Sequence, residues 1–151
     1  MSRLTTTRTE GRRSIIPARH EAAHACVALV LNHHVNWSSV GKTKNGWLGL
    51  TSFRPKGNPD PFLYSLILLA GSCADEKLSK IPKWKYAHSD REILKGFGFS
   101  SFSINSMRHY SMALCDRLWC QIQDVAEELV EHDLTGEEIK KLVKIKPLRL
   151  K

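Results

Sequence analysis

The sequence lacks several features that would assign it to a common class of protein. Its four cysteines, Cys26, Cys73, Cys115 and Cys120, form no CxxC pair, which argues against a zinc ribbon or a thioredoxin-like motif. The longest apolar run, residues 62–70, is about half as long as a membrane-spanning helix needs to be. The N-terminal residues are rich in Thr, Arg and Ser and do not resemble a signal peptide. We therefore expect a cytoplasmic protein with reduced cysteines and no membrane segment.

The body of the chain has little net charge, because the positive charge is concentrated at the two ends. The 151 residues carry a net charge of +8, of which residues 1–19 contribute +4 and residues 140–151 contribute +6, leaving −2 between them. Basic ends can contact nucleic acid or an acidic partner. However, no aromatic residues alternate with the N-terminal arginines, so base stacking there has no support. We expect a flexible basic arm at 1–13, one folded domain at 14–146 and a basic tail at 147–151.

The pattern of apolar and turn residues predicts a mostly α (α+β) domain with one small β-sheet or hairpin. Residues 35–53 are β-prone and contain the sequence Asn45-Gly46, a typical hairpin turn. A capping box of Thr135 and Glu138 predicts the start of a last short helix. Apolar periodicity and helix-breaking residues predict the other helices at 18–31, 61–78, 90–95 and 105–131. Ser14 is the predicted cap of the first of these helices.

The most specific feature is the segment His20-Glu21-Ala22-Ala23-His24 in the first predicted helix. Helical residues i and i+4 lie about 40° apart around the axis, so both imidazoles can reach one ion. Glu21 is turned about 100° from His20, where it can act as a base without binding the metal. This is the HExxH pattern of zinc peptidases. A catalytic zinc needs a third protein ligand, and spacing leaves seven candidates open: His33, His34, Asp75, Glu76, His88, Asp90 and Glu92.

Several segments, in the same order, resemble the peptidase domain of FtsH-type ATP-dependent zinc proteases. The resemblance covers about residues 15–145. The matching segments are 19–25 with that family's HEAGHA motif, 48–51 with its LGYT strand, 68–76 with its LLAGRAAEE helix, 88–90 with its SND segment, and 134–139 with its LxGEEI ending. This ordered set is far more specific than HExxH alone.

The resemblance implies which residues form the site. Zinc would be held by His20, His24 and Asp90, and Glu21 would be the general base. One strand would bind the backbone of a substrate chain by strand addition. The residues of that strand are Trp47, Leu48, Gly49, Leu50 and Thr51.

The chain also departs from the family pattern. It contains no Walker A motif or AAA+ module, so the resemblance is to the peptidase part alone. Ala23 replaces the glycine of HEAGH, which favours the helix, and Ser89 replaces the asparagine before Asp90 and can still act as a cap. By the same comparison, Asp75 and Glu76 would lie on a supporting helix, where they would either support the metal ligands or have a structural role.

These observations predict a zinc metalloendopeptidase that hydrolyses flexible or unfolded polypeptides and is ATP-independent by itself. A separate unfoldase or an acidic protein is a candidate partner. Two alternatives stay open: a catalytically retired peptidase fold used for binding or regulation, and a nucleic-acid-associated factor that acts through its basic termini. The sequence does not predict an oligomeric state.

Overall fold

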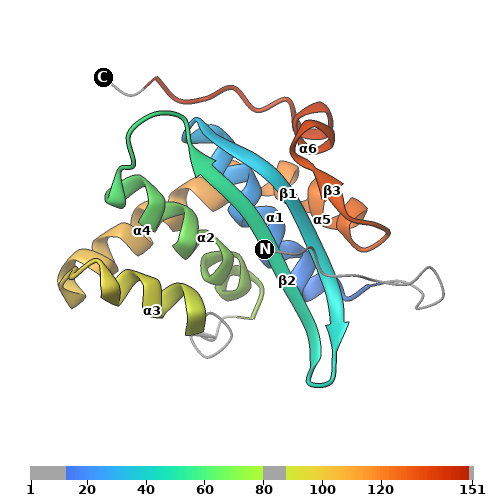
Figure 1. The fold of residues 1–151 in the computed structure, drawn as a ribbon, viewed down its shortest axis with the longest axis horizontal. Helices are drawn as coiled ribbons and strands as arrows, with labels where there is room; N and C mark the ends of the chain where they lie inside the picture. Colours follow the sequence, from blue (N-terminus) through green and yellow to red (C-terminus); the bar gives the residue numbers. More distant parts are fainter. Residues whose placement is uncertain (1–12, 80–87, 150–151) are drawn as a thin grey trace.

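The computed structural model describes residues 13–79 and 88–149 (Figure 1). Most described residues are helical, and one small antiparallel sheet lies among the helices, which confirms the predicted mostly α (α+β) class. Arm residues 1–12, loop residues 80–87 and tail residues 150–151 lie outside the described part. In chain order the elements are α1 (Ile15–Val30), β1 (His33–Thr43), β2 (Gly46–Pro55), α2 (Pro61–Ser79), α3 (His88–Gly96), α4 (Ser101–Arg117), α5 (Trp119–Leu129), β3 (Leu134–Thr135) and α6 (Gly136–Val143).

Helix α1 is the centre of the core. It contacts the sheet, α2 and α5, and its residues from Glu21 to Val30 are all buried. A helix that is covered on all sides needs small or apolar side chains, and α1 is rich in alanine. It begins three residues before the predicted start; Ser14 occupies the N-cap position, but its side chain makes no capping hydrogen bond. The helix ends at Val30, one residue before the predicted end, with Leu31 as its C-cap, and Asn32 follows with a left-handed φ of 59°.

The sheet has the strand order β2-β1-β3, and all its pairs are antiparallel. The predicted hairpin is confirmed, with Lys44 and Asn45 as its loop and Gly46, the first residue of β2, at a φ of 112° that favours glycine. A bulge interrupts the register between Val35 and Trp37. A Cβ at Gly136 would collide with the Val35 carbonyl oxygen, so only glycine fits where α6 crosses this bulge. Within the described residues β2 pairs only with β1 and is therefore an edge strand.

The prediction of one helix at 105–131 is wrong. The segment forms two helices, α4 and α5, that meet at Leu118. The backbone of Leu118 leaves helical geometry, with a φ of −99° and a ψ of 11°, although hydrogen bonds from Leu118 N–H to Leu114 O and from Ile122 N–H to Leu118 O carry the ladder through the junction. The two helices have different partners, because α4 packs on α2 and α5 packs on α1. Helix α4 also begins early, at a cap where the Ser100 side chain accepts a hydrogen bond from Ser103 N–H.

Both ends of the described chain are attached to the domain. Arg13, assigned above to the flexible arm, donates its backbone N–H to Val130 O at 2.9 Å and its guanidinium to Asp133 Oδ1 at 2.7 Å. Leu148, assigned to the tail, donates its N–H to Val30 O at 2.7 Å. The folded domain thus begins at or before residue 13 and extends at least to residue 148. No described helix combines the length and apolar character needed to cross a membrane.

Candidate metal centre

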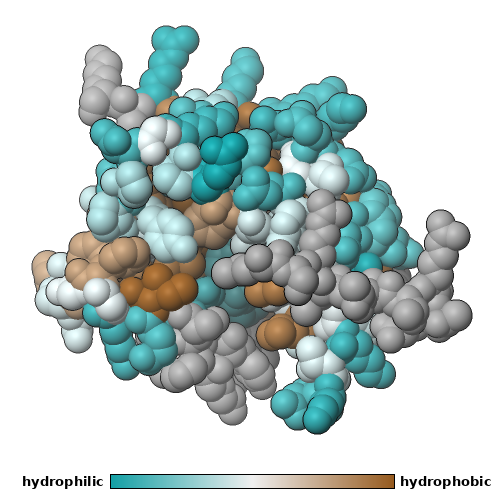
Figure 2. Space-filling model, viewed as in Figure 1, coloured by the Kyte–Doolittle hydropathy of each residue, from teal (hydrophilic) through white to brown (hydrophobic). Residues whose placement is uncertain are grey.

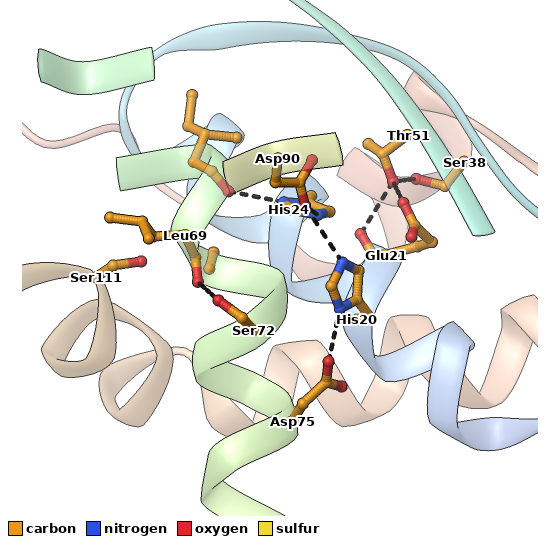
Figure 3. A network of polar contacts seen from close by, with 12 residues as sticks. His20, Glu21, His24, Ser38, Thr51, Leu69, Ser72, Asp75, Asp90 and Ser111 are labelled. Atoms are coloured by element: carbon orange, nitrogen blue, oxygen red, sulfur yellow. Dashed lines mark hydrogen bonds and ion pairs between the residues drawn. The ribbon is translucent and has the colours of Figure 1, made fainter. Parts of the chain in front are cut away.

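Three predicted ligands from two helices meet at one point. His20 and His24 lie one turn apart on α1, and Asp90 lies in the first turn of α3 (Figure 3). Asp90 Oδ2 is 3.6 Å from His20 Nε2 and 3.4 Å from His24 Nε2. All three ligand atoms lie within 4.8 Å of one another, and no other group of three His, Cys, Asp or Glu side chains does so in the described part of the chain.

Helix α2 fixes the orientation of both imidazoles. His24 Nδ1 lies 2.7 Å from the Ile67 carbonyl oxygen, and His20 Nδ1 lies 2.8 Å from Asp75 Oδ2. A carbonyl oxygen can only accept a hydrogen bond, so His24 Nδ1 must carry the proton, and the same holds for His20 facing an ionised Asp75. In each neutral ring the lone pair then lies on Nε2, toward Asp90. Histidine ligands of metals are usually oriented in this way.

The charges around the imidazoles favour a cation. Burial alone lowers the pKa of His20, but hydrogen bonds to Asp75 and Asp90 and the nearby Glu21 charge raise that pKa to about 10. For His24, burial also lowers the pKa, and the charge of Asp90 outweighs it, so the pKa is raised. Burial raises the pKa of the Asp90 carboxyl, but the two imidazoles hold it well below its ordinary range. The attraction that keeps protons on these rings would also hold a divalent cation.

The donor set fits zinc. Tetrahedral zinc with bonds of about 2.0–2.2 Å separates its ligand atoms by about 3.3–3.6 Å. The two distances from Asp90 Oδ2 agree with this range. Two imidazoles and one carboxylate are a typical protein ligand set for catalytic zinc and leave the fourth position for water or substrate.

Glu21 lies beside this cluster without belonging to it. Its side chain is buried, with the residue only 5% exposed, and its Oε1 accepts a hydrogen bond of 2.8 Å from the Thr51 hydroxyl on β2. A Cβ at Gly49, also on β2, would overlap the Glu21 side chain. The predicted base is therefore separate from the predicted ligands and in contact with the predicted substrate strand.

That strand, Trp47 to Thr51, lies within the edge strand β2. Gly49 and Thr51 face Glu21, while Leu48 is half exposed. Trp47 is partly buried and packs against the core. The structure thus places the strand next to the candidate base.

The other ligand candidates that can be described do not reach the cluster. His33 is buried with Nδ1 3.1 Å from Leu31 O, and Glu76 forms an ion pair with Arg108. Glu92 pairs with Lys95 on the surface. His34 is paired in the β1–β2 ladder and is not in the cluster. The side chains of His88 and Ser89 lie outside the described residues.

Sequence reasoning missed two residues of the site. A Cβ at Gly71 on α2 would lie 2.6 Å from His24 Nε2 and would also collide with His20, so glycine is needed for the rings to approach α2. A glycine inside a helix costs about 1 kcal/mol relative to alanine, which is a signal of close packing. The other is Ser38 on β1, whose hydroxyl lies 2.9 Å from Thr51 Oγ1. No sequence signal indicated it.

Comparisons with known proteins do not identify the chain. No protein-family model matches it, and no match is found among curated proteins. The function is therefore inferred from the geometry of the site and from the sequence resemblance described above.

Proposed function

We propose that this protein is a zinc metalloendopeptidase acting on flexible or unfolded polypeptides. One observation carries the proposal: His20, His24 and Asp90 direct one ligand atom each to a common point, with the Glu21 carboxylate buried beside them. A zinc ion held by these residues would polarise the substrate carbonyl and lower the pKa of water to about 7. HExxH helices of zinc peptidases use this combination of ligands and base.

The protein's own residues supply the remaining parts of the mechanism. Asp75 and the Ile67 carbonyl keep the Nδ1 protons in place, so that the Nε2 atoms stay directed at the ligand site. Glu21 would accept a proton from the attacking water and later pass it to the leaving amine. Its buried position, with a hydroxyl group holding one carboxylate oxygen, supports this role.

Strand β2 would receive the substrate. Within the described residues its outer edge is unpaired, so an extended chain could add there as a further strand through backbone hydrogen bonds. Such binding requires an unfolded substrate, but its strength depends little on the amino-acid sequence of that substrate. Beside the strand, aromatic rings from β2, α2 and the α3–α4 loop form a continuous row: Phe53 contacts Tyr64 at 5.2 Å between ring centroids, and Tyr64 contacts Phe97 at 5.8 Å.

Figure 2 shows apolar surface on the side of the molecule where α2 and α3 lie. Exposed apolar residues of these helices and the following loop include Phe62, Ile93 and Phe97. Unfolded polypeptides expose apolar side chains, so this surface favours them as substrates. The proposal also includes a cytoplasmic location, in agreement with four free cysteines, and a separate unfoldase for folded substrates.

Purified protein tests the proposal directly. We expect one zinc per chain and cleavage of casein, an unstructured substrate, without ATP. Glu21→Gln keeps the shape of the side chain and should retain zinc, but cleavage per zinc-loaded protein should fall by about 100-fold or more because the base is lost. Equal rates in both proteins would show that the activity is a contaminant or uses another base. Bound zinc without cleavage in either protein would instead favour a binding or regulatory module.

A further inference from the structure

Two hydroxyl groups connect the sheet to the candidate base. Thr51 Oγ1 lies 2.8 Å from Glu21 Oε1, and Ser38 Oγ lies 2.9 Å from Thr51 Oγ1 (Figure 3). Ser38 and Thr51 are direct partners in the β1–β2 register, so the pair is held by the hairpin itself. Thr51 Oγ1 is also 3.2 Å from the Glu21 backbone oxygen, which keeps the hydroxyl over the turn of α1 that carries the base.

The direction of these hydrogen bonds follows from counting protons. An ionised carboxylate can only accept, so the single Thr51 hydroxyl proton is donated to Glu21. Ser38 must then be the donor to Thr51. Both donors are thus ordered toward the carboxylate, as in a short hydrogen-bonded chain. Ser38 is fully buried at a sheet position where an apolar β-branched residue would pack better, which argues for a role of its hydroxyl.

Strand β2 restricts Glu21 at a second position. A Cβ at Gly49 would lie 2.7 Å from the Glu21 carboxyl carbon, so the backbone of Gly49 approaches the carboxylate more closely than a residue with a Cβ could. A glutamate side chain has several rotatable bonds, and contacts at two positions of the strand reduce its freedom. The base is therefore held by the strand that carries Gly49 and Thr51.

We propose that Thr51 and Ser38 are positioning residues for Glu21, so that the strand receiving the substrate also fixes the position of the catalytic base. The inference rests on the proposed peptidase function and extends it by coupling substrate docking to catalysis. A substrate long enough to pair along β2 restricts the motion of the strand further and, through Thr51, that of the carboxylate. Longer extended peptides should then be cleaved with a higher kcat, as well as a lower KM, than short ones.

The test compares Thr51→Val, Thr51→Ser and Ser38→Ala in the full chain. Valine keeps the shape of threonine without the donor, and serine restores the donor. Zinc content should be unchanged in all three. In Thr51→Val, kcat for an unstructured peptide should fall about 10- to 100-fold, as for a lost hydrogen bond to a charged group, with KM nearly unchanged. Thr51→Ser should recover most of this loss, and Ser38→Ala should show a smaller loss.

A double mutant separates positioning from general stability. If Thr51 acts through Glu21, adding Thr51→Val to Glu21→Gln should lower kcat no further, and the gain in kcat with peptide length should disappear in Thr51→Val alone. An equal loss of kcat in both backgrounds, a change confined to KM, or no change would refute the positioning role while leaving the peptidase proposal intact.

A measurement without zinc or substrate tests the hydrogen bond between Thr51 and Glu21 directly. Thermal unfolding midpoints of metal-free wild type, Thr51→Val, Glu21→Ala and the double mutant measure the coupling between residues 21 and 51. Non-additive midpoints are expected from the hydrogen bond, and additive midpoints would overturn the inference. If the wild-type protein cleaves nothing, the peptidase proposal and the positioning role both fail, and any coupling then reports a contact that serves only the fold.

Discussion

Replacing Gly71 by alanine should separate metal binding from folding. Gly71 lies in α2 opposite the Nε2 atoms of the two predicted histidine ligands. The substitution adds one methyl group to a helix interior, where alanine is intrinsically better than glycine by about 1 kcal/mol. The added atom, however, points at the side of the imidazoles that would bind the metal.

The expected effect follows from the distances. The new Cβ would lie 2.6 Å from His24 Nε2, whereas ordinary contacts begin at 3.4 Å, so the ring must move by about 0.8 Å. Metal-ligand distances tolerate only about 0.2 Å. The His24 Nδ1 hydrogen bond to Ile67 O, at 2.7 Å, opposes this movement. We expect zinc affinity to fall by about 100-fold or more, the upper end of the loss seen when a supporting residue is removed.

Competition with a fluorescent zinc chelator measures this affinity, and circular dichroism checks the helix content. Gly96→Ala is a matched control, because a Cβ at Gly96, the last residue of α3, meets no atom within 4 Å. Gly71→Ala should retain helical content and lose zinc, while Gly96→Ala should retain both. Tight zinc binding by Gly71→Ala would refute the arrangement of the two histidines against α2.

Two further predictions concern the fold. Thr135→Ala removes the side chain that accepts a hydrogen bond from Glu138 N–H at the start of α6. The substitution should lower the free energy of unfolding, measured by urea titration, by about 1 kcal/mol. No change would show that this cap contributes nothing to stability. In thiol titration with Ellman's reagent at neutral pH, native protein should react at Cys120 alone, because the other three cysteines are buried and burial raises the pKa of Cys73 to about 12; rapid reaction of a second thiol would contradict the described core.

Local patterns predicted the part of the site that lies on one helix. His20, Glu21 and His24 are related by helical geometry alone, so their spacing in the sequence was sufficient to predict that they lie in one site. Asp90 reaches them only because α3 packs against α2, and no local pattern contains that contact. Spacing left it among seven candidates, and the family resemblance alone singled it out. Gly71 and Ser38 act through neighbours distant in sequence and could not be recognised from their own surroundings.

The wrong prediction of a single helix has a similar cause. Every residue of the segment 105–131 is compatible with a helix, so its periodicity predicts one element. The break in helical geometry at Leu118 separates α4 and α5, which pack on different helices, and it leaves the hydrogen-bond ladder continuous. By contrast, the hairpin turn at residues 44–46 and the capping box of Thr135 and Glu138 are short-range features, and both are confirmed.

Zinc stoichiometry in two alanine variants tests whether His20, His24 and Asp90 form a zinc site. Asp90→Ala removes the carboxylate of the cluster, whereas Glu76→Ala removes a nearby carboxylate that pairs with Arg108 instead. After dialysis against a weak chelator, metal analysis should find one zinc per chain in wild type and Glu76→Ala and almost none in Asp90→Ala. Full zinc in Asp90→Ala with loss in Glu76→Ala would refute this ligand set and place the carboxylate ligand on α2.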